Sequence, residues 1–194
     1  MLRGMALPRK KPASYEDLLA VPEHLVAEIV DDVLYTSPRP AAPHALAASA
    51  LIVELGGSFG FGRAGGPGGW VVLIEPELHI VGQIMIPDLA AWRRERMPVI
   101  PDAPFFDLAP DWLCEVVSPS TGALDRAKKM PHYARAGVGH VWLADPTPKT
   151  LEVYRLDDGG GVGWRLAATH EGDTVIKAPP FDAVTLDLAR LWAR

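Results

Sequence analysis

Four short apolar runs between residues 70 and 118 constrain the fold of this chain most strongly. In order they read WVVLIEP, ELHIVG, IMIPDLAAW and DWLCEVVS. Runs of this length that are rich in valine, isoleucine and aromatic residues are typical of buried β-strands. Four of them in succession predict a sheet whose apolar faces must be covered by other elements.

The segment that precedes these runs predicts a short helix and a β-hairpin. Ser14 and Asp17 form a start that resembles a capping box, for a helix that ends before Pro22. The stretch LVAEIVDDVLYTS alternates around the turn pair Asp31 and Asp32. Alternation on both sides of a turn predicts the hairpin.

Two longer helices are predicted, one before and one after the four runs. Apolar residues at helical spacing predict an amphipathic helix over residues 43–55, which a pair of glycines would end. A second helical pattern covers residues 121–136, where Pro131 would introduce a kink and Gly137 would end the helix. Its N-cap is predicted at Ser120 or Thr121. It carries two stripes of side chains, Asp125, Lys129 and Tyr133 on one and Leu124, Lys128 and His132 on the other.

The remaining chain predicts more strands and completes the fold class. HVWLADP, TLEVYRL, GWRLAATH and DTVIKAP read as strands that are joined by turns rich in glycine, aspartate and proline. The pattern as a whole predicts a mixed α/β (α+β) fold in which one sheet is flanked by helices. With 194 residues, we expect one domain over residues 14–194, preceded by a loose basic arm over residues 1–13.

Composition argues against several classes of protein. The net charge of −5 gives no overall basic surface for nucleic acid, although a local basic patch is compatible with it. The single cysteine, Cys114, excludes an intramolecular disulfide, and its place in an apolar strand predicts a packed and inert thiol. No apolar run is long enough to span a membrane, and the N-terminus lacks the apolar core of a signal peptide, so we expect a cytoplasmic protein.

Two carboxylates occur inside the apolar runs. Asp88 follows Pro87 in one run, and Glu115 lies in the next, on the same strand face as Leu113 and Val117. Carboxylates on neighbouring strands raise each other's pKa, and a divalent metal removes that repulsion. Mg²⁺ takes such oxygen ligands, and a metal so held can activate water for phosphodiester hydrolysis. The alternative is that Asp88 ends a strand and Glu115 pairs with a buried arginine or lysine.

Several segments in order resemble one protein family. They are AEIVDDVLYTSPRPAAPH, IMIPDLA, LCEVVSPST, DRAKKMPHYARAGVGHVWLADP and LEVYRL. Together they resemble the Uma-two family of restriction-endonuclease-like proteins, a branch of the PD-(D/E)XK nuclease superfamily. The resemblance extends from about Tyr15 to Val153 and implies a restriction endonuclease-like core, with a central mixed sheet and flanking helices.

The resemblance also implies the residues of a metal-dependent nuclease site. Asp88 and Glu115 would hold Mg²⁺, or Mn²⁺ in its place, and the backbone carbonyl of Val116 would be a further ligand. Glu28 would be an accessory acid close to the metal, with an exposed hairpin residue as the alternative. His44, near a helix start, would support the site and would not bind the metal itself.

The chain departs from the superfamily at its lysine. That lysine normally follows the acid by two residues, where this chain has Val117. In this branch the matching position lies in the next helix at Lys129, four residues before Tyr133. There it would orient the attacking water or offset charge on the phosphorane. Lys128 is the alternative, and it would point about a quarter-turn away.

Other basic residues admit two interpretations. Arg93, Arg94 and Arg96 would contact phosphates near Asp88, or would simply be exposed to solvent. The basic residues of the helix over residues 121–136 would otherwise form an ordinary solvated face. These are Arg126, Lys128, Lys129 and Arg135.

The sequence therefore predicts a Mg²⁺-dependent phosphodiester hydrolase that acts on DNA as an endonuclease. A second interpretation, a catalytically weak or inactive nuclease-fold protein that binds nucleic acid or serves as an accessory protein, follows from the acidic net charge and Val117. A third keeps the metal site and changes the substrate to a small phosphoester.

Assembly as a homodimer is a further expectation, since two sites facing opposite strands would suit double-strand cleavage. The chain has more tryptophans than a core of this size normally uses, so some would lie at the interface between the two copies. They are Trp70, Trp92, Trp112, Trp142, Trp164 and Trp192.

Overall fold

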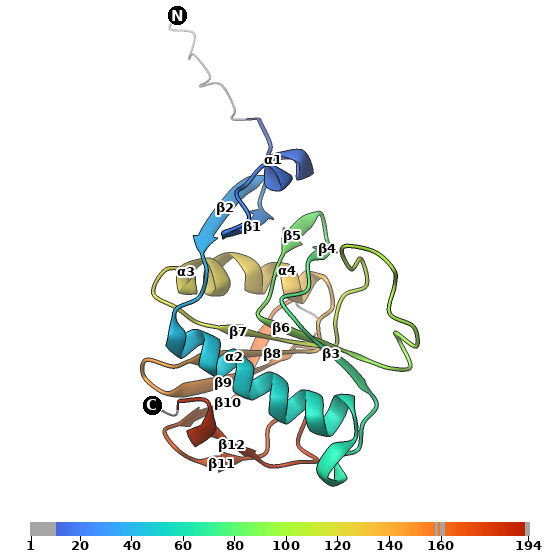
Figure 1. The fold of residues 1–194 in the computed structure, drawn as a ribbon, viewed down its shortest axis with the longest axis vertical. Helices are drawn as coiled ribbons and strands as arrows, with labels where there is room; N and C mark the ends of the chain where they lie inside the picture. Colours follow the sequence, from blue (N-terminus) through green and yellow to red (C-terminus); the bar gives the residue numbers. More distant parts are fainter. Residues whose placement is uncertain (1–10, 158, 160–161, 193–194) are drawn as a thin grey trace, which may run out of the picture.

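A computed structural model describes residues 11–157, 159 and 162–192 of the chain (Figure 1). Most of the predicted N-terminal arm, residues 1–10, lies outside this part, and so do three residues of the predicted loop between the strands TLEVYRL and GWRLAATH. At the end of the arm, Ala13 donates its backbone N–H to the carbonyl of Asp32 at 2.9 Å. The arm is therefore attached to the hairpin at this point.

A six-stranded mixed sheet forms the centre of the fold, as predicted. Its only parallel pair among the described strands is β7 with β8, and the other neighbours run antiparallel. A parallel pair needs a long crossover connection, which the second helical segment supplies. Across the sheet the strands are β10 (Trp164–Glu171), β9 (Thr150–Leu156), β8 (His140–Asp145), β7 (Trp112–Val116), β6 (Leu89–Arg93) and β3 (Trp70–Ile74).

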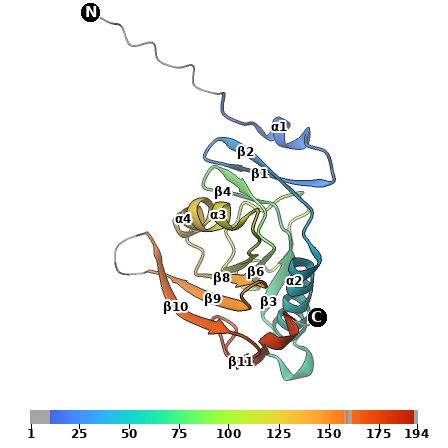
Figure 2. The same ribbon diagram turned by 90° about the vertical axis from the view of Figure 1, so that its left-hand side faces the viewer.

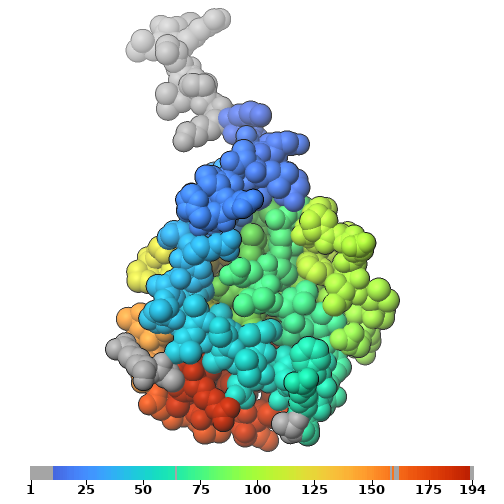
Figure 3. Space-filling view, viewed as in Figure 1, coloured from blue at the N-terminus to red at the C-terminus, as the bar shows by residue number. Residues whose placement is uncertain are grey.

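A smaller four-stranded sheet caps one end of the molecule (Figure 3). The hairpin turn has positive φ at both Asp31 (52°) and Asp32 (64°), as a two-residue turn of type I′ requires, which confirms the predicted hairpin. Helix α1 (Tyr15–Leu19) lies beside it with the predicted capping box of Ser14 and Asp17. In order, the strands of this sheet are β2 (Val33–Pro38), β1 (Leu25–Val30), β5 (Gln83–Met85) and β4 (Leu78–Ile80).

One predicted strand is wrong. IMIPDLAAW forms two strands, because β5 ends at Met85 in the smaller sheet and β6 begins at Leu89 in the larger one. Pro87 has no N–H to donate to a ladder, and the chain passes between the two sheets at this proline. Asp88 is therefore not inside a strand but immediately before one.

Helix α2 (Ala42–Leu55) agrees with the predicted helix over residues 43–55. The predicted stop at its two glycines is wrong by one turn. Gly56 keeps helical dihedral angles (φ −64°, ψ −38°), and a π-helical turn η1 (Gly56–Gly60) continues the helix.

The second helical segment consists of three pieces. They are α3 (Gly122–Leu124), the π-helical turn η3 (Asp125–Lys129) and α4 (Met130–Arg135). Pro131 lies in the first turn of α4, and Gly137, with φ of 79°, ends the segment as predicted. The predicted capping side chain is wrong: the hydroxyl of Ser118 accepts the N–H of Thr121 at 3.2 Å.

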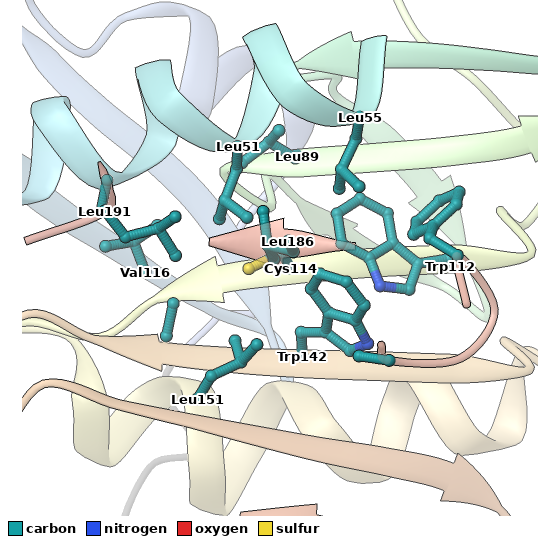
Figure 4. Packing of buried hydrophobic residues seen from close by; sticks show 14 of the residues in the cluster. Leu51, Leu55, Leu89, Trp112, Cys114, Val116, Trp142, Leu151, Leu186 and Leu191 are labelled. Atoms are coloured by element: carbon teal, nitrogen blue, oxygen red, sulfur yellow. The ribbon is translucent and has the colours of Figure 1, made fainter. Parts of the chain in front are cut away.

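The larger sheet is covered on both faces, as Figures 1 and 2 show. Strand β7 alternates as predicted, with Trp112, Cys114 and Val116 on the face that packs against α2 (Figure 4). Leu113 and Val117 face the side of α4 and the smaller sheet. The C-terminal part completes the α2 side with β11 (Val175–Ile176), β12 (Leu186–Asp187) and the 3₁₀ turn η4 (Leu188–Arg190).

Two further predictions concern buried side chains. Cys114 is fully buried, and burial raises the pKa of its thiol well above the usual value, so the thiol stays protonated as predicted. Five of the six tryptophans are buried in the core, and only Trp164 is half-buried. The tryptophans therefore give no support to the predicted homodimer, which remains a prediction. No helix in the described part is long and apolar enough to cross a membrane.

Candidate active site

A buried lysine is surrounded by three carboxylates beside strand β7. The Nζ atom of Lys129 lies 2.8 Å from Oε1 of Glu28, 2.9 Å from Oε1 of Glu115 and 3.5 Å from Oδ1 of Asp125. The lysine side chain is only 2% exposed. Burial alone would lower the pKa of Lys129, but Glu115 and Glu28 raise it well above its usual value. The lysine is therefore charged.

These groups come from three different elements. Glu28 belongs to β1 of the smaller sheet, Glu115 to β7 of the larger sheet, and Asp125 and Lys129 to the π-helical turn. The predicted stripe is confirmed, since Tyr133, one turn further on, donates its hydroxyl proton to Oε1 of Glu115 at 2.6 Å. Residues far apart in the sequence therefore meet only when both sheets and this helix are assembled.

Lys128 occupies the other predicted stripe and lies outside this cluster. Its Nζ atom pairs with Asp31 in the hairpin turn at 3.1 Å, and His132 contacts the same carboxylate at 2.9 Å. Of the two candidate lysines, the structure therefore brings Lys129 to the predicted acids.

Asp88 lies beside Glu115, as the predicted pairing of their strands requires. Leu89 pairs with Cys114, and the same register carried one residue further places Asp88 opposite Glu115. Its Oδ2 atom accepts the backbone N–H of Val116 at 2.7 Å. Its Oδ1 atom lies 3.2 Å from Nε2 of His44, in the first turn of α2.

His44 supports Asp88, as predicted. Burial would lower the pKa of His44, but its hydrogen bond to Asp88 and the charges of Asp88, Asp125 and Glu75 together raise it above the usual value. The histidine therefore tends to carry a proton and to donate it to Asp88. Its Nδ1 atom is buried and has no partner among the described residues.

A cavity of about 280 Å³ opens over these groups. One wall is the segment 37–41 between β2 and α2, and another is the loop 118–121 that leads into α3. In that loop the Ser118 hydroxyl lies within 3.0 Å of the hydroxyls of Ser120 and Thr121. The charged residues that line the cavity are Glu28, Arg39, Glu75, Asp88, Glu115, Asp125 and Lys129.

The lining carries an excess of negative charge, with five carboxylates against two permanent cations. Burial raises the pKa of Glu115 well above its usual value, and Asp125, Asp88 and Glu28 raise it further, although Lys129 opposes them. Burial also raises the pKa of Asp125, against the effects of Lys129 and Thr121. One lysine does not balance these acids, so a proton or a further cation would be bound favourably.

The donor atoms of the cavity fit Mg²⁺. They are oxygens, and Oε2 of Glu115 accepts no hydrogen bond from the described residues. No three His, Cys, Asp or Glu side chains of the described part converge on one ready-made ion position. Mg²⁺ does not need such a group, because it usually binds one or two carboxylates and keeps several waters. Asp88, Glu115 and the carbonyl of Val116 would meet that need.

The structure separates the predicted residues into two sets. Glu28, Asp88, Glu115, Val116 and Lys129 come together, and sequence reasoning missed Asp125 and Tyr133 as members of the site. Their stripe on the predicted helix, shared with Lys129, was the signal that pointed to them.

The three arginines after β6 do not lie near Asp88. They are at the opposite end of that strand, about 17 Å away at roughly 3.4 Å per residue. Arg93 lies over the ring of Trp70, Arg96 pairs with Asp111 at 2.9 Å, and Arg94 donates to a backbone carbonyl. Their predicted phosphate contact near Asp88 is wrong, and the alternative of exposed side chains is confirmed.

The fold and this arrangement place the chain among nuclease-like α/β proteins. A solved structure from Anabaena variabilis ATCC 29413, described as a putative nuclease belonging to DUF820, superimposes with a TM-score of 0.73. The match has 21% sequence identity and covers 94% of this chain and 98% of that one, so it shows a shared fold. The chain matches no curated protein sequence.

The family follows from the sequence. The model of the Uma2 family, described as "Putative restriction endonuclease", matches residues 12–189. The chain belongs to the Uma2 family, which confirms the resemblance that its segments indicated.

Proposed function

We propose that the chain is a Mg²⁺-dependent phosphodiester hydrolase that cleaves DNA as an endonuclease. The observation that carries this proposal is the position of Asp88 opposite Glu115, with the ammonium group of Lys129 2.9 Å from Glu115. Two carboxylates with an adjacent cation are what a metal-assisted attack of water on a phosphate requires. Membership of the Uma2 family supports the same reaction class.

Each residue would have a distinct task. Mg²⁺, or Mn²⁺ in its place, would polarise the phosphoryl oxygen and lower the pKa of a water when held by Asp88, Glu115 and the carbonyl of Val116. Lys129 would orient that water and offset the charge that develops on the phosphorane. The oxygen of the water forms the new bond to phosphorus, the bond to the leaving oxygen breaks, and that oxygen takes up a proton.

Three neighbouring groups would hold the reacting residues in place. Glu28 holds the ammonium group of Lys129 and itself accepts the backbone N–H of Ile86 at 2.7 Å. His44 and Tyr133 donate to Asp88 and Glu115 respectively. Side chains fixed by such contacts keep a site in its reactive geometry.

A binding or accessory protein without strong activity is the second candidate. Two observations favour it: Val117 occupies the usual lysine position, and three carboxylates already engage Lys129. An ammonium group held in this way is less available to a water molecule.

Calorimetric titration with Mg²⁺ and Mn²⁺, followed by DNA cleavage assays, tests both candidates. Asp88→Asn and Glu115→Gln remove one negative charge each from the site, and Glu95→Gln removes one from an exposed position as the matched control. We expect the control to behave as the wild type and each site variant to lose at least about 100-fold in metal affinity and cleavage rate, since even a residue that only supports a metal ligand can contribute that much.

Each result has a clear meaning. Cleavage that persists in both site variants would show that the site is assigned wrongly. Metal binding without cleavage of any DNA would favour the accessory protein. Turnover of a chromogenic phosphodiester without DNA cleavage would favour a small phosphoester as the substrate.

A further inference from the structure

A second cavity, of about 260 Å³, adjoins the acidic one. The two share four lining residues, Val26, Arg39, Glu75 and Ile86. The rest of the second cavity is aliphatic and comes from α1, from β1 and from the segment between them. Those residues are Leu18, Leu19, Val21, Leu25 and Ala27. A charged cleft and an apolar pocket therefore lie next to each other.

Arg39 lies at the boundary between the two cavities. Its Nη2 atom donates to the carbonyl of Glu23 at 2.9 Å, and its Nη1 atom lies 3.8 Å from Oε2 of Glu75. The side chain is 58% exposed, and an exposed ion pair at that distance contributes little stability. Pro38 and Pro40 on either side restrict the backbone that carries it. The guanidinium is thus held in place and can exchange Glu75 for a phosphate, which arginine binds in a bidentate manner.

An exposed leucine on the wall of the pocket points to an apolar occupant. Leu19 is 64% exposed although it belongs to a helix whose next residue inward, Leu18, is buried. A flat apolar group in the pocket would cover this side chain and remove its surface from water. Nucleobases have such faces, and pockets for single bases are lined by apolar or aromatic side chains.

We propose that the two cavities together bind one unpaired nucleotide of single-stranded DNA. This inference rests on the proposed function, because it places the phosphodiester in the acidic cleft. The base occupies the aliphatic pocket, and Arg39 binds a phosphate between them. In a duplex the base is stacked and paired, so it cannot enter such a pocket unless it leaves the helix.

The depth of the acidic site favours the same substrate. The side chains of Glu115 and Lys129 are 3% and 2% exposed, so the phosphate must enter the cleft to reach them. A single strand is flexible enough to do so, and proteins that bind single strands combine a cationic contact to the backbone with apolar contacts to the bases.

The test compares one DNA sequence in three forms: a single strand, a blunt duplex and a strand without bases. Binding is followed by fluorescence anisotropy in Ca²⁺, which takes the same oxygen ligands, and cleavage is followed separately in Mg²⁺. We expect the single strand to bind and to be cut at least about tenfold better than the duplex, because flipping a base from a duplex costs a few kcal/mol.

Variants of Arg39 and Leu19 test the two halves of the site. Arg39→Ala should weaken single-strand binding by about 10- to 100-fold, as expected for lost hydrogen bonds to a charged group. It should also reduce the slope of log affinity against log salt by about 0.7, the value for one phosphate contact on a single strand. Arg39→Lys should keep that slope and recover part of the affinity. Arg63→Ala, at another exposed arginine, is the control and should change neither.

Leu19→Ser should weaken binding of the normal strand several-fold and leave the strand without bases unaffected. Val53→Ser, at a residue that is exposed elsewhere on the surface, is its control. Both positions are exposed, so neither variant should disturb folding.

The outcomes separate this inference from the proposed function. A preference for duplex, or single-strand binding that ignores Arg39 and Leu19, would overturn the inference even if DNA is cleaved. Single-strand binding that depends on both residues without any cleavage would support the inference and count against the hydrolase. Neither binding nor cleavage of any DNA would overturn both.

Discussion

Replacing Lys129 by methionine is the sharpest test of the charge balance in the site. The substitution keeps a side chain of similar length and removes the one cation that contacts Glu28, Glu115 and Asp125, at 2.8, 2.9 and 3.5 Å. Removing one partner of a buried ion pair costs about 3–5 kcal/mol, because the other charge stays buried without compensation. That is a large part of a typical unfolding free energy of about 5–15 kcal/mol.

The loss of stability should depend on pH in a defined direction. The pKa values of Glu115 and Asp125 are raised in the folded protein, so their protonated forms are favoured there. Near pH 5 these carboxyls can take up protons and relieve the missing charge, and as pH rises through their raised pKa values the relief is lost. The destabilisation by Lys129→Met should therefore be larger at pH 8 than at pH 5, and Mg²⁺ should reverse part of it at pH 8.

Urea unfolding, followed by the fluorescence of the buried tryptophans at both pH values, measures this effect. Lys128→Met is the matched control, because Lys128 is 49% exposed and pairs with an exposed Asp31. An exposed pair contributes about 0–1 kcal/mol, with no dependence on Mg²⁺. If the two variants lose the same stability, or if the loss at Lys129 is the same at both pH values, the reasoning about the buried cluster is refuted.

Three other changes should have effects that follow from single contacts. Tyr133→Phe removes the 2.6 Å hydrogen bond to Glu115 and should lower the unfolding free energy by about 1.5–3 kcal/mol in thermal melts, whereas an unchanged melt would contradict that bond. Mg²⁺ affinity, measured by calorimetry over a pH series, should rise with pH because the metal competes with protons on Glu115, and a flat profile would count against this carboxylate as a ligand. Leu51→Ala should cost about 2–5 kcal/mol in chemical unfolding, since this side chain is fully buried under the sheet, and Val53→Ala, at a residue 69% exposed on the same helix, should cost at most about 0.5 kcal/mol.

The local periodicity of the sequence was sufficient to predict the parts of the site that belong to regular elements. Alternation in β7 placed Glu115 on the face opposite Cys114, and helical spacing placed Lys129 and Tyr133 on one stripe. Spacing alone did not select Lys129 over Lys128, and that choice came from the resemblance to the family. The physical difference is burial, which depends on where β1 docks.

The parts that the sequence did not predict depend on contacts between distant segments. The chain leaves one sheet for another at Pro87, and a proline in an apolar run does not by itself indicate which sheet the next residues join. Asp125 lies four residues before Lys129, a pair that is usually an ordinary solvent-exposed helix contact. Arg39 lies in an irregular segment, where no periodicity predicts the direction of a side chain.

The division of the site between two sheets gives it a stability of its own. Glu28 comes from the smaller sheet, and its contact with Lys129 spans the boundary to the rest of the molecule. A partial opening that moves β1 away from the π-helical turn would separate these two groups while the larger sheet stays folded. The free energy of that local opening, rather than that of global unfolding, would then set the conditions under which the site remains assembled.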